Sequence, residues 1–116
     1  NNSNADIFVS IHLNKFPPSQ SYSGWQTFYQ KKSDDSKILA NAIQVNLNKN
    51  IEKENNRHIM PISNIYIMDH VEVPSVIVEC GFLSNPEECE NLKTESYQNK
   101  VAWGIYLGLQ EYFSNK

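Results

Sequence analysis

The sequence predicts an α/β fold, a three-layer α/β/α sandwich around a mostly parallel twisted sheet. Short β-branched segments alternate with segments of helical periodicity along the 116 residues. Two apolar segments, residues 5–12 and 74–79, end in the polar side chains His12 and Glu79, as strands do where a sheet meets a crevice. No repeat, low-complexity segment or linker divides the chain, so we expect at most one domain.

Composition excludes several classes of protein. The net charge is −3 with both signs scattered, so the clustered cations of a nucleic-acid-binding surface are absent from the sequence. No apolar run approaches the about 20 residues that span a bilayer. Cys80 and Cys89 are too few for a disulfide framework or a structural zinc site, and we expect free thiols.

The first half of the chain predicts two strands and a helix. Residues 5–12 alternate with both faces largely apolar, as expected of a central strand. Residues 15–24 contain two prolines and a glycine and predict a loop, and residues 25–30 predict a second strand. Ser33 is placed to cap a helix. Its apolar stripe is Leu39, Ala42, Ile43 and Leu47.

The second half predicts two more strands and two helices. The polar residues 52–64 indicate a connection, and residues 65–68 and 74–79 indicate strands. Asn85, the proline after it and Glu88 form a helix-start pattern in which the glutamate closes a capping box. A final helix is predicted from about Tyr97 to Phe113, with Tyr97, Val101, Ile105 and Leu109 on its inner face.

The two strand-end residues predict one polar site above the sheet. Carboxylates are rarely buried unless they are paired, hydrogen-bonded or metal-bound. From the residues alone, two structural alternatives stay open. His12 could be a hydrogen-bonded core histidine, and Glu79 could accept backbone N–H groups of the turn at residues 81–85.

Three segments carry a family resemblance. Ser10-Ile11-His12-Leu13-Asn14 and Val78-Glu79-Cys80-Gly81-Phe82-Leu83-Ser84-Asn85 frame an aromatic strand at residues 23–29. In this order and spacing they resemble the zinc-dependent N-acetylmuramoyl-L-alanine amidases, which cleave the glycan-to-peptide amide of peptidoglycan. The resemblance spans nearly the whole chain but only the later part of a family domain. Residues 1–116 are therefore expected to be the C-terminal portion of a single catalytic domain.

The resemblance implies a zinc ligand and a catalytic residue. His12 matches the last zinc ligand of the family and Glu79 its catalytic acid/base. The family's other two ligands, a histidine and a glutamate, lie upstream of the matched part. One imidazole cannot hold Zn²⁺ tightly, so we expect the chain alone to be inactive.

Other residues are weaker candidates. Asn14 could orient the site, bind substrate or serve as a turn asparagine. Asp69 and His70 could line a groove, although the family often has a basic residue where His70 stands. We expect the remainder to be structural: a solvated His58, core positions for Trp25, Tyr29 and Cys80, and a Ser10 without the setting of a nucleophile.

The resemblance also implies a setting. We expect peptidoglycan as substrate, action outside the cytoplasmic membrane and a likeness to the cortex-preparing amidases of spore formers. Whether an activating protein partner is needed stays open. The isolated chain should self-associate or pair with the upstream part. Two other hypotheses remain open, namely a non-catalytic wall-binding or scaffold remnant and a zinc hydrolase of another amide.

Overall fold

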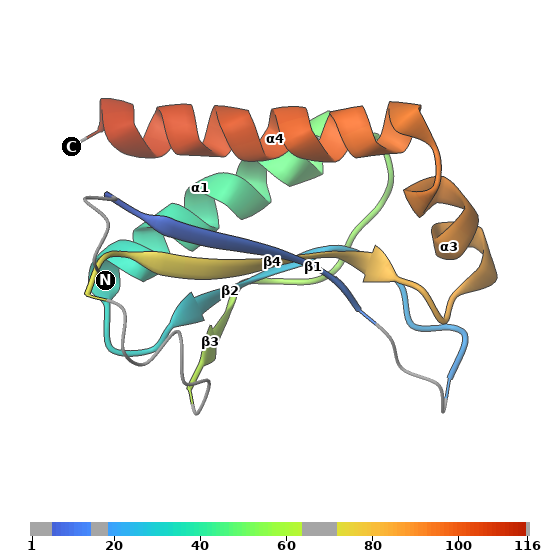
Figure 1. Cartoon of the computed structure of the whole chain (residues 1–116), viewed down its shortest axis with the longest axis horizontal. Helices are drawn as coiled ribbons and strands as arrows, with labels where there is room; N and C mark the ends of the chain where they lie inside the picture. Colours follow the sequence, from blue (N-terminus) through green and yellow to red (C-terminus); the bar gives the residue numbers. More distant parts are fainter. Residues whose placement is uncertain (1–5, 15–18, 64–71, 116) are drawn as a thin grey trace.

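The computed structural model describes residues 6–14, 19–63 and 72–115, which form one sheet and its covering helices (Figure 1). The strands are β1 (Phe8–Asn14), β2 (Gln26–Gln30), β3 (Met60–Ile62) and β4 (Ser75–Phe82), and the helices are α1 (Asp34–Asn50), α3 (Pro86–Leu92) and α4 (Glu95–Ser114). The strand order is β1-β4-β2-β3. β1 pairs parallel with β4 and β2 parallel with β3, whereas β2 and β4 are antiparallel. The predicted α/β class with a mostly parallel sheet is confirmed.

The long helices α1 and α4 lie on the same side of the sheet (Figure 1). Alternate residues of β4, namely Val76, Val78 and Cys80, join the core formed with these helices. Two glycines of α4 let the helices approach closely. A Cβ on Gly108 would lie 2.6 Å from the Cα of Ile43. The core therefore fixes one face of β4 against the helices and leaves the other face to carry the site.

Local signals begin both long helices. The Ser33 side chain accepts from the Ser36 backbone N–H at the start of α1, as predicted. Thr94 does the same for Tyr97 at the start of α4, which begins two residues before the predicted position. No helix in the described ranges is long and apolar enough to cross a membrane.

Three of the predicted strand segments differ from the prediction or lie outside the described residues. β1 lies at an edge of the sheet formed by the described strands, not at its centre, and Ile11 is 58% exposed. The predicted connection at residues 52–64 contains strand β3. Its first two residues are exposed and one of them is Pro61, so the segment lacks the apolar pattern of a buried strand. Proline is confined to edge strands, and β3 is one in the described sheet. The strand predicted at residues 65–68 lies outside the described residues.

Candidate active site

His12 and Glu79 are direct partners in the parallel ladder of β1 and β4. Because side chains alternate along both strands, the two point to the same face, opposite to Cys80 and the helices. The strands run in the same direction, so both residues lie towards the carboxyl edge of the sheet, where α/β proteins place their sites. The structure confirms that the imidazole and the carboxyl group lie at one place on the sheet. Their chemical roles stay predictions.

A third polar side chain completes a row across the sheet. Gln26 of β2 is the cross-strand partner of Glu79 on its other side. Its Nε2 donates to the His58 carbonyl at 2.7 Å, and its Oε1 accepts from Arg57 at 3.4 Å. Glu79 thus lies between an imidazole and a carboxamide, with a guanidinium one hydrogen bond further away.

Burial shifts the proton affinity of Glu79. Desolvation raises the pKa of its carboxyl group above the usual value, and the opposing charge of His12 lowers it to a smaller extent. Its Oε2 is buried and has no hydrogen-bond partner in the described part of the chain. The predicted alternative of a carboxylate held by the following turn does not account for this oxygen. A carboxyl group in this state is suited to take up and release a proton.

Ser10 orients His12. The Ser10 Oγ lies 2.8 Å from His12 Nε2, and which atom donates depends on the imidazole tautomer. A register shift follows between His12 and Asn14, where Asn14 pairs with Phe82. Such irregularities re-aim side chains beside sites.

Glu88 fixes the frame around Glu79, in a way the sequence did not predict. Asn85 accepts from the Glu88 N–H at 3.1 Å, which confirms the cap of α3. The Glu88 carboxylate does not close a capping box. It accepts from the backbone N–H groups of Phe82 and Gly24, each at 2.7 Å. One charge therefore joins the end of β4 to the entry of β2, the two strands that hold Glu79 and Gln26.

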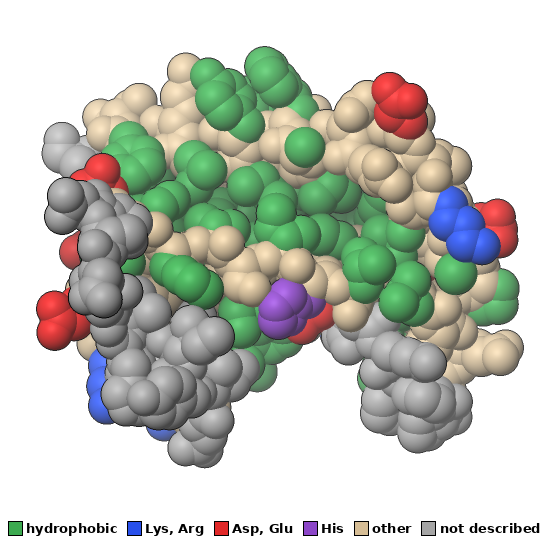
Figure 2. Space-filling model, viewed as in Figure 1, with side chains coloured by type: hydrophobic (Ala, Val, Ile, Leu, Met, Phe, Trp, Pro, Cys, Tyr) green, Lys and Arg blue, Asp and Glu red, His purple; other side chains and the backbone are tan. Residues whose placement is uncertain are grey.

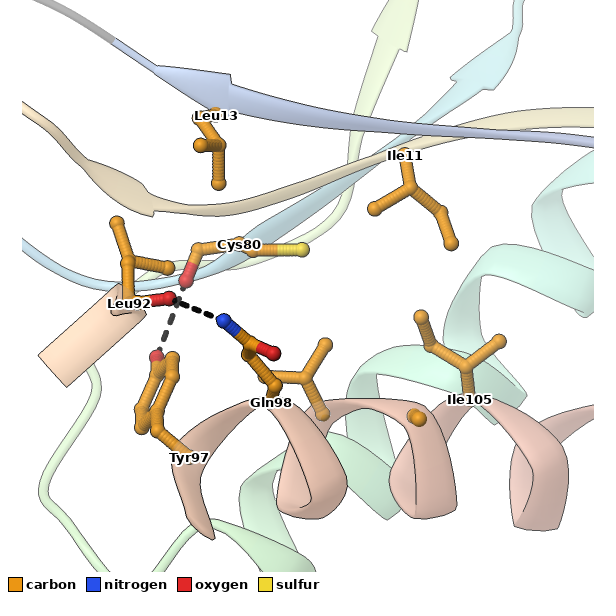
Figure 3. Close-up of a pocket in the computed structure, with 9 residues that line it drawn as sticks. Ile11, Leu13, Cys80, Leu92, Tyr97, Gln98 and Ile105 are labelled. Atoms are coloured by element: carbon orange, nitrogen blue, oxygen red, sulfur yellow. Dashed lines mark hydrogen bonds between the residues drawn. The ribbon is translucent and has the colours of Figure 1, made fainter. Parts of the chain in front are cut away.

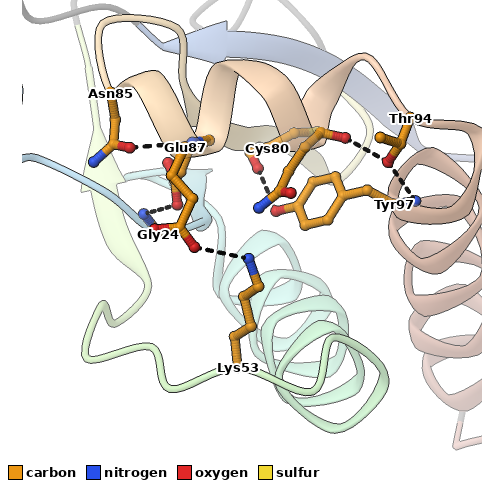
Figure 4. Close-up of polar contacts among 9 residues, drawn as sticks. Gly24, Lys53, Cys80, Asn85, Glu87, Thr94 and Tyr97 are labelled. Atoms are coloured by element: carbon orange, nitrogen blue, oxygen red, sulfur yellow. Dashed lines mark hydrogen bonds and ion pairs between the residues drawn. The ribbon is translucent and has the colours of Figure 1, made fainter.

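Gly81 permits this return of the chain. Its φ of +156° lies in a region that residues with a side chain rarely adopt, and a Cβ there would lie 3.2 Å from Glu88 Oε1. Behind it, the Tyr97 hydroxyl donates to the Cys80 carbonyl at 3.0 Å (Figure 4). The backbone on the carboxyl side of Glu79 is thus held from both α3 and α4.

The opposite face of the same strands forms an apolar groove. It is a cavity of about 270 Å³ between β1, β4 and α4 (Figure 3). Its main apolar lining is Ile11, Leu13, Cys80, Leu92, Val101 and Ile105. Figure 2 shows the hydrophobic side chains that gather below α4 on this side of the molecule. The groove holds no pair of groups suited to hydrolysis.

The remaining residues singled out in the sequence fall into confirmed and untested predictions. Trp25 is buried in the core and Tyr29 packs against it, and His58 is exposed, as expected. Cys80 and Cys89 are free thiols, as predicted. Asp69 and His70 lie outside the described residues. The backbone of Asn14 ends β1, and the roles predicted for its side chain stay predictions.

The described residues fit part of a zinc site. No group of three or more histidine, cysteine or acidic side chains in the described ranges could hold a metal by itself. His12 offers one imidazole, the commonest kind of zinc ligand in catalytic sites, beside a carboxyl group with an unpartnered buried oxygen. This donor set requires further ligands from residues beyond these.

Comparison with known proteins defines the class. A family model described as N-acetylmuramoyl-L-alanine amidase matches residues 1–111. The chain belongs to this family of peptidoglycan amidases.

Particular relatives agree with the family match. The chain is 43% identical over 116 residues to the germination-specific N-acetylmuramoyl-L-alanine amidase of Bacillus subtilis, covering all of this chain and 48% of that protein. It is 50% identical, with a TM-score of 0.95, to the CwlD amidase from Clostridioides difficile, solved in complex with the GerS lipoprotein, covering 99% of this chain and 58% of that one. An N-acetylmuramoyl-L-alanine amidase from Clostridium difficile 630 matches at 33% identity and a TM-score of 0.91, covering 62% of that chain. The chain thus spans roughly half of its curated relative.

Proposed function

We propose that the protein containing this chain hydrolyses the amide bond between N-acetylmuramic acid and L-alanine of peptidoglycan. One observation carries the proposal. Glu79, with a pKa raised by burial and an unpartnered Oε2, lies in register with His12 at the carboxyl edge of the sheet. The family match supports the substrate class.

In this reaction Glu79 moves protons. Its carboxylate takes a proton from the attacking water and delivers it to the departing amide nitrogen. Burial favours the protonated state between these two steps, because the charged form is less well solvated there. Gln26 and His12 on either side limit where the carboxyl group can turn.

His12 is the residue of this chain that would hold the zinc ion. A zinc ion held there would supply Lewis acidity toward the scissile carbonyl and a bound water. Ser10 fixes the orientation of the His12 ring, as partners of metal-binding histidines commonly do. The remaining ligands would come from the upstream part of the domain, so the chain alone should be inactive.

We further propose that residues 1–116 are the C-terminal portion of one catalytic domain, and that the apolar groove and the β1 edge receive the rest of it. The exposed Ile11 and Leu13 on β1 supply apolar surface for this contact. We also propose that it acts outside the cytoplasmic membrane, on wall or spore cortex, and the name of the germination-specific relative supports this. The complex of CwlD with the GerS lipoprotein supports an activating protein partner.

A product assay tests the proposal. The full-length protein, incubated with purified muropeptides, should release peptides that begin with L-alanine. Glu79→Gln should lower kcat by about 10²–10⁴-fold, the usual contribution of a general acid/base. Cleavage at another bond, or full activity in Glu79→Gln, would refute it. Binding to peptidoglycan without cleavage would instead favour a scaffold role.

A further inference from the structure

Arg57 lies in an open depression beside the candidate active site. The depression has a volume of about 400 Å³ and is lined by residues 21–23 and 54–57. Its lining includes serine hydroxyls, asparagine amides and the guanidinium of Arg57, the one arginine in the sequence. The surface is polar, unlike the groove below α4.

Four contacts hold the Arg57 side chain in place. Its Nε donates to the Ser23 carbonyl at 2.6 Å and its Nη1 donates to Gln26 Oε1 at 3.4 Å. The guanidinium also lies over the rings of Phe82 and Tyr22, with 4.6 Å and 5.9 Å to the ring centroids. A long side chain fixed in this way has already lost most of its rotamer freedom, so it can bind a ligand at little further entropic cost.

Gly24 makes room for this arrangement. It has a φ of +103°, and a Cβ there would collide with Asn55 Oδ1 and lie 3.2 Å from the Nε and Cδ of Arg57. The Glu88 carboxylate holds the Gly24 backbone N–H. Glu88 therefore holds both the end of β4, the strand of Glu79, and the backbone at Gly24 beside Arg57.

Among the described residues, no acidic side chain neutralises the positive charge of Arg57. No carboxylate pairs with it in the part of the chain that the structure describes, where the ion pairs are Lys53 with Glu87 and Lys93 with Glu90. A guanidinium has five N–H groups, and three of them have no partner among the described residues. Glu54 lines the depression without pairing with Arg57, and as an exposed group it is screened by solvent.

Arg57 is linked to Glu79 through Gln26, a separation that a short peptide substrate can span. Glu79 and Gln26 are direct partners, which places their Cα atoms about 4.5–5.5 Å apart, and Arg57 is bonded to the Gln26 side chain. Consecutive Cα atoms of a peptide are about 3.8 Å apart. A carboxylate one residue beyond the scissile amide would therefore reach the guanidinium while the amide stays beside Glu79.

We propose that Arg57 binds the α-carboxylate of the stem-peptide residue that follows L-alanine. The inference rests on the amidase function proposed above and adds a specificity determinant to it. Guanidinium and carboxylate fit as a bidentate pair, which an uncharged carboxamide at the same position cannot reproduce. The site would thus distinguish wall peptides with a free acid from those amidated at this residue.

Paired substrates test this. The full-length, zinc-loaded protein is assayed on two muropeptides that differ only in a free carboxyl or a carboxamide at the residue after L-alanine. The wild type should prefer the acid by about tenfold or more in kcat/KM, as expected for loss of one charge-assisted pair. Arg57→Met should abolish the preference, so that the acid and the amide are cleaved with similar kcat/KM. Lys53→Met, a nearby exposed cation outside the depression, should keep the full preference.

Other outcomes overturn the inference. A wild type without preference, or an Arg57→Met variant that loses activity equally on both substrates, would show that Arg57 only supports the fold. If Arg57→Met does not fold, Arg57→Lys keeps the charge without the fork and should retain only part of the preference. Calorimetric binding of acyl-L-Ala-D-Glu and its α-carboxamide to Glu79→Gln makes the readout independent of turnover. If Glu79→Gln binds the acid selectively but the wild-type protein hydrolyses neither substrate, this inference is retained and the amidase function is rejected.

Discussion

The carboxyl group of Glu79 lies in register with the imidazole of His12, on the sheet face that the long helices leave open. This pairing depends on two parallel strands that end at the same edge, so the sheet itself brings the two groups together. Glu88, Gly81 and Tyr97 then hold the backbone that follows Glu79.

Glu88→Gln should destabilise the protein by about 1–3 kcal/mol, the cost of weakening a charged acceptor of two part-buried N–H groups. Its neighbour Glu87 provides a matched control, since it forms only an exposed ion pair with Lys53 at 3.5 Å. Glu87→Gln should change the free energy of unfolding by less than about 0.5 kcal/mol. Urea unfolding of the full-length protein measures both, and equal effects would contradict the role given to Glu88.

Gly108→Ala should destabilise the helix pair by about 1–3 kcal/mol, because the added methyl group meets the α1 backbone at Ile43. Gln110→Ala, at an exposed position of the same helix, should stay within about 0.5 kcal/mol of the wild type. Thermal unfolding followed by circular dichroism compares them. A neutral Gly108→Ala would mean that α1 and α4 lie further apart than described.

The two thiols should differ in reactivity. Burial, followed by the charge of Glu79, raises the pKa of Cys80 to about 11, so its thiolate is scarce at pH 8 and becomes abundant only as the pH approaches that value. Cys89 is only half-buried. Alkylation at pH 8 should therefore label Cys89 first, and Cys89→Ser should abolish the fast phase. A fast phase that survives in Cys89→Ser and disappears in Cys80→Ser would contradict the burial of Cys80.

The isolated 116-residue chain should be poorly soluble or oligomeric. Ile11 and Leu13 are 58% and 50% exposed on an edge strand beside the apolar groove. Ile11→Lys should reduce the mass seen by light scattering, whereas Ile38→Lys, equally exposed at 57% but on α1, should not. A monomeric wild-type chain at high concentration would show that this surface does not drive association.

The sequence predicts the elements better than their contacts. Apolar strands that end in His12 and Glu79, together with the caps at Ser33 and Asn85, are local signals and could be read directly. The neighbours of Glu79 depend on strand order. The pairing of Gln26 with Glu79 follows from β2 lying antiparallel beside β4, which no local pattern states.

The contacts of Glu88 and Arg57 were not predicted from the sequence, for physical reasons. The Glu88 side chain was predicted to bond within its own helix start, but the turn at Gly81 brings the more distant N–H groups of Phe82 and Gly24 within reach. Arg57 lies in a polar connection, and its place at the site comes from long-range bonds to Ser23 and Gln26. Such tertiary contacts override local propensity and leave no periodic signal.

The most direct test of the account is zinc content per polypeptide in the full-length protein. The wild type should contain one zinc ion per chain. His12→Ala should lose it, whereas Glu79→Gln should keep the metal and lose activity, because the two residues have different roles. A wild type without zinc, or a His12→Ala variant that retains it, would contradict the assignment of His12 and the proposed zinc chemistry.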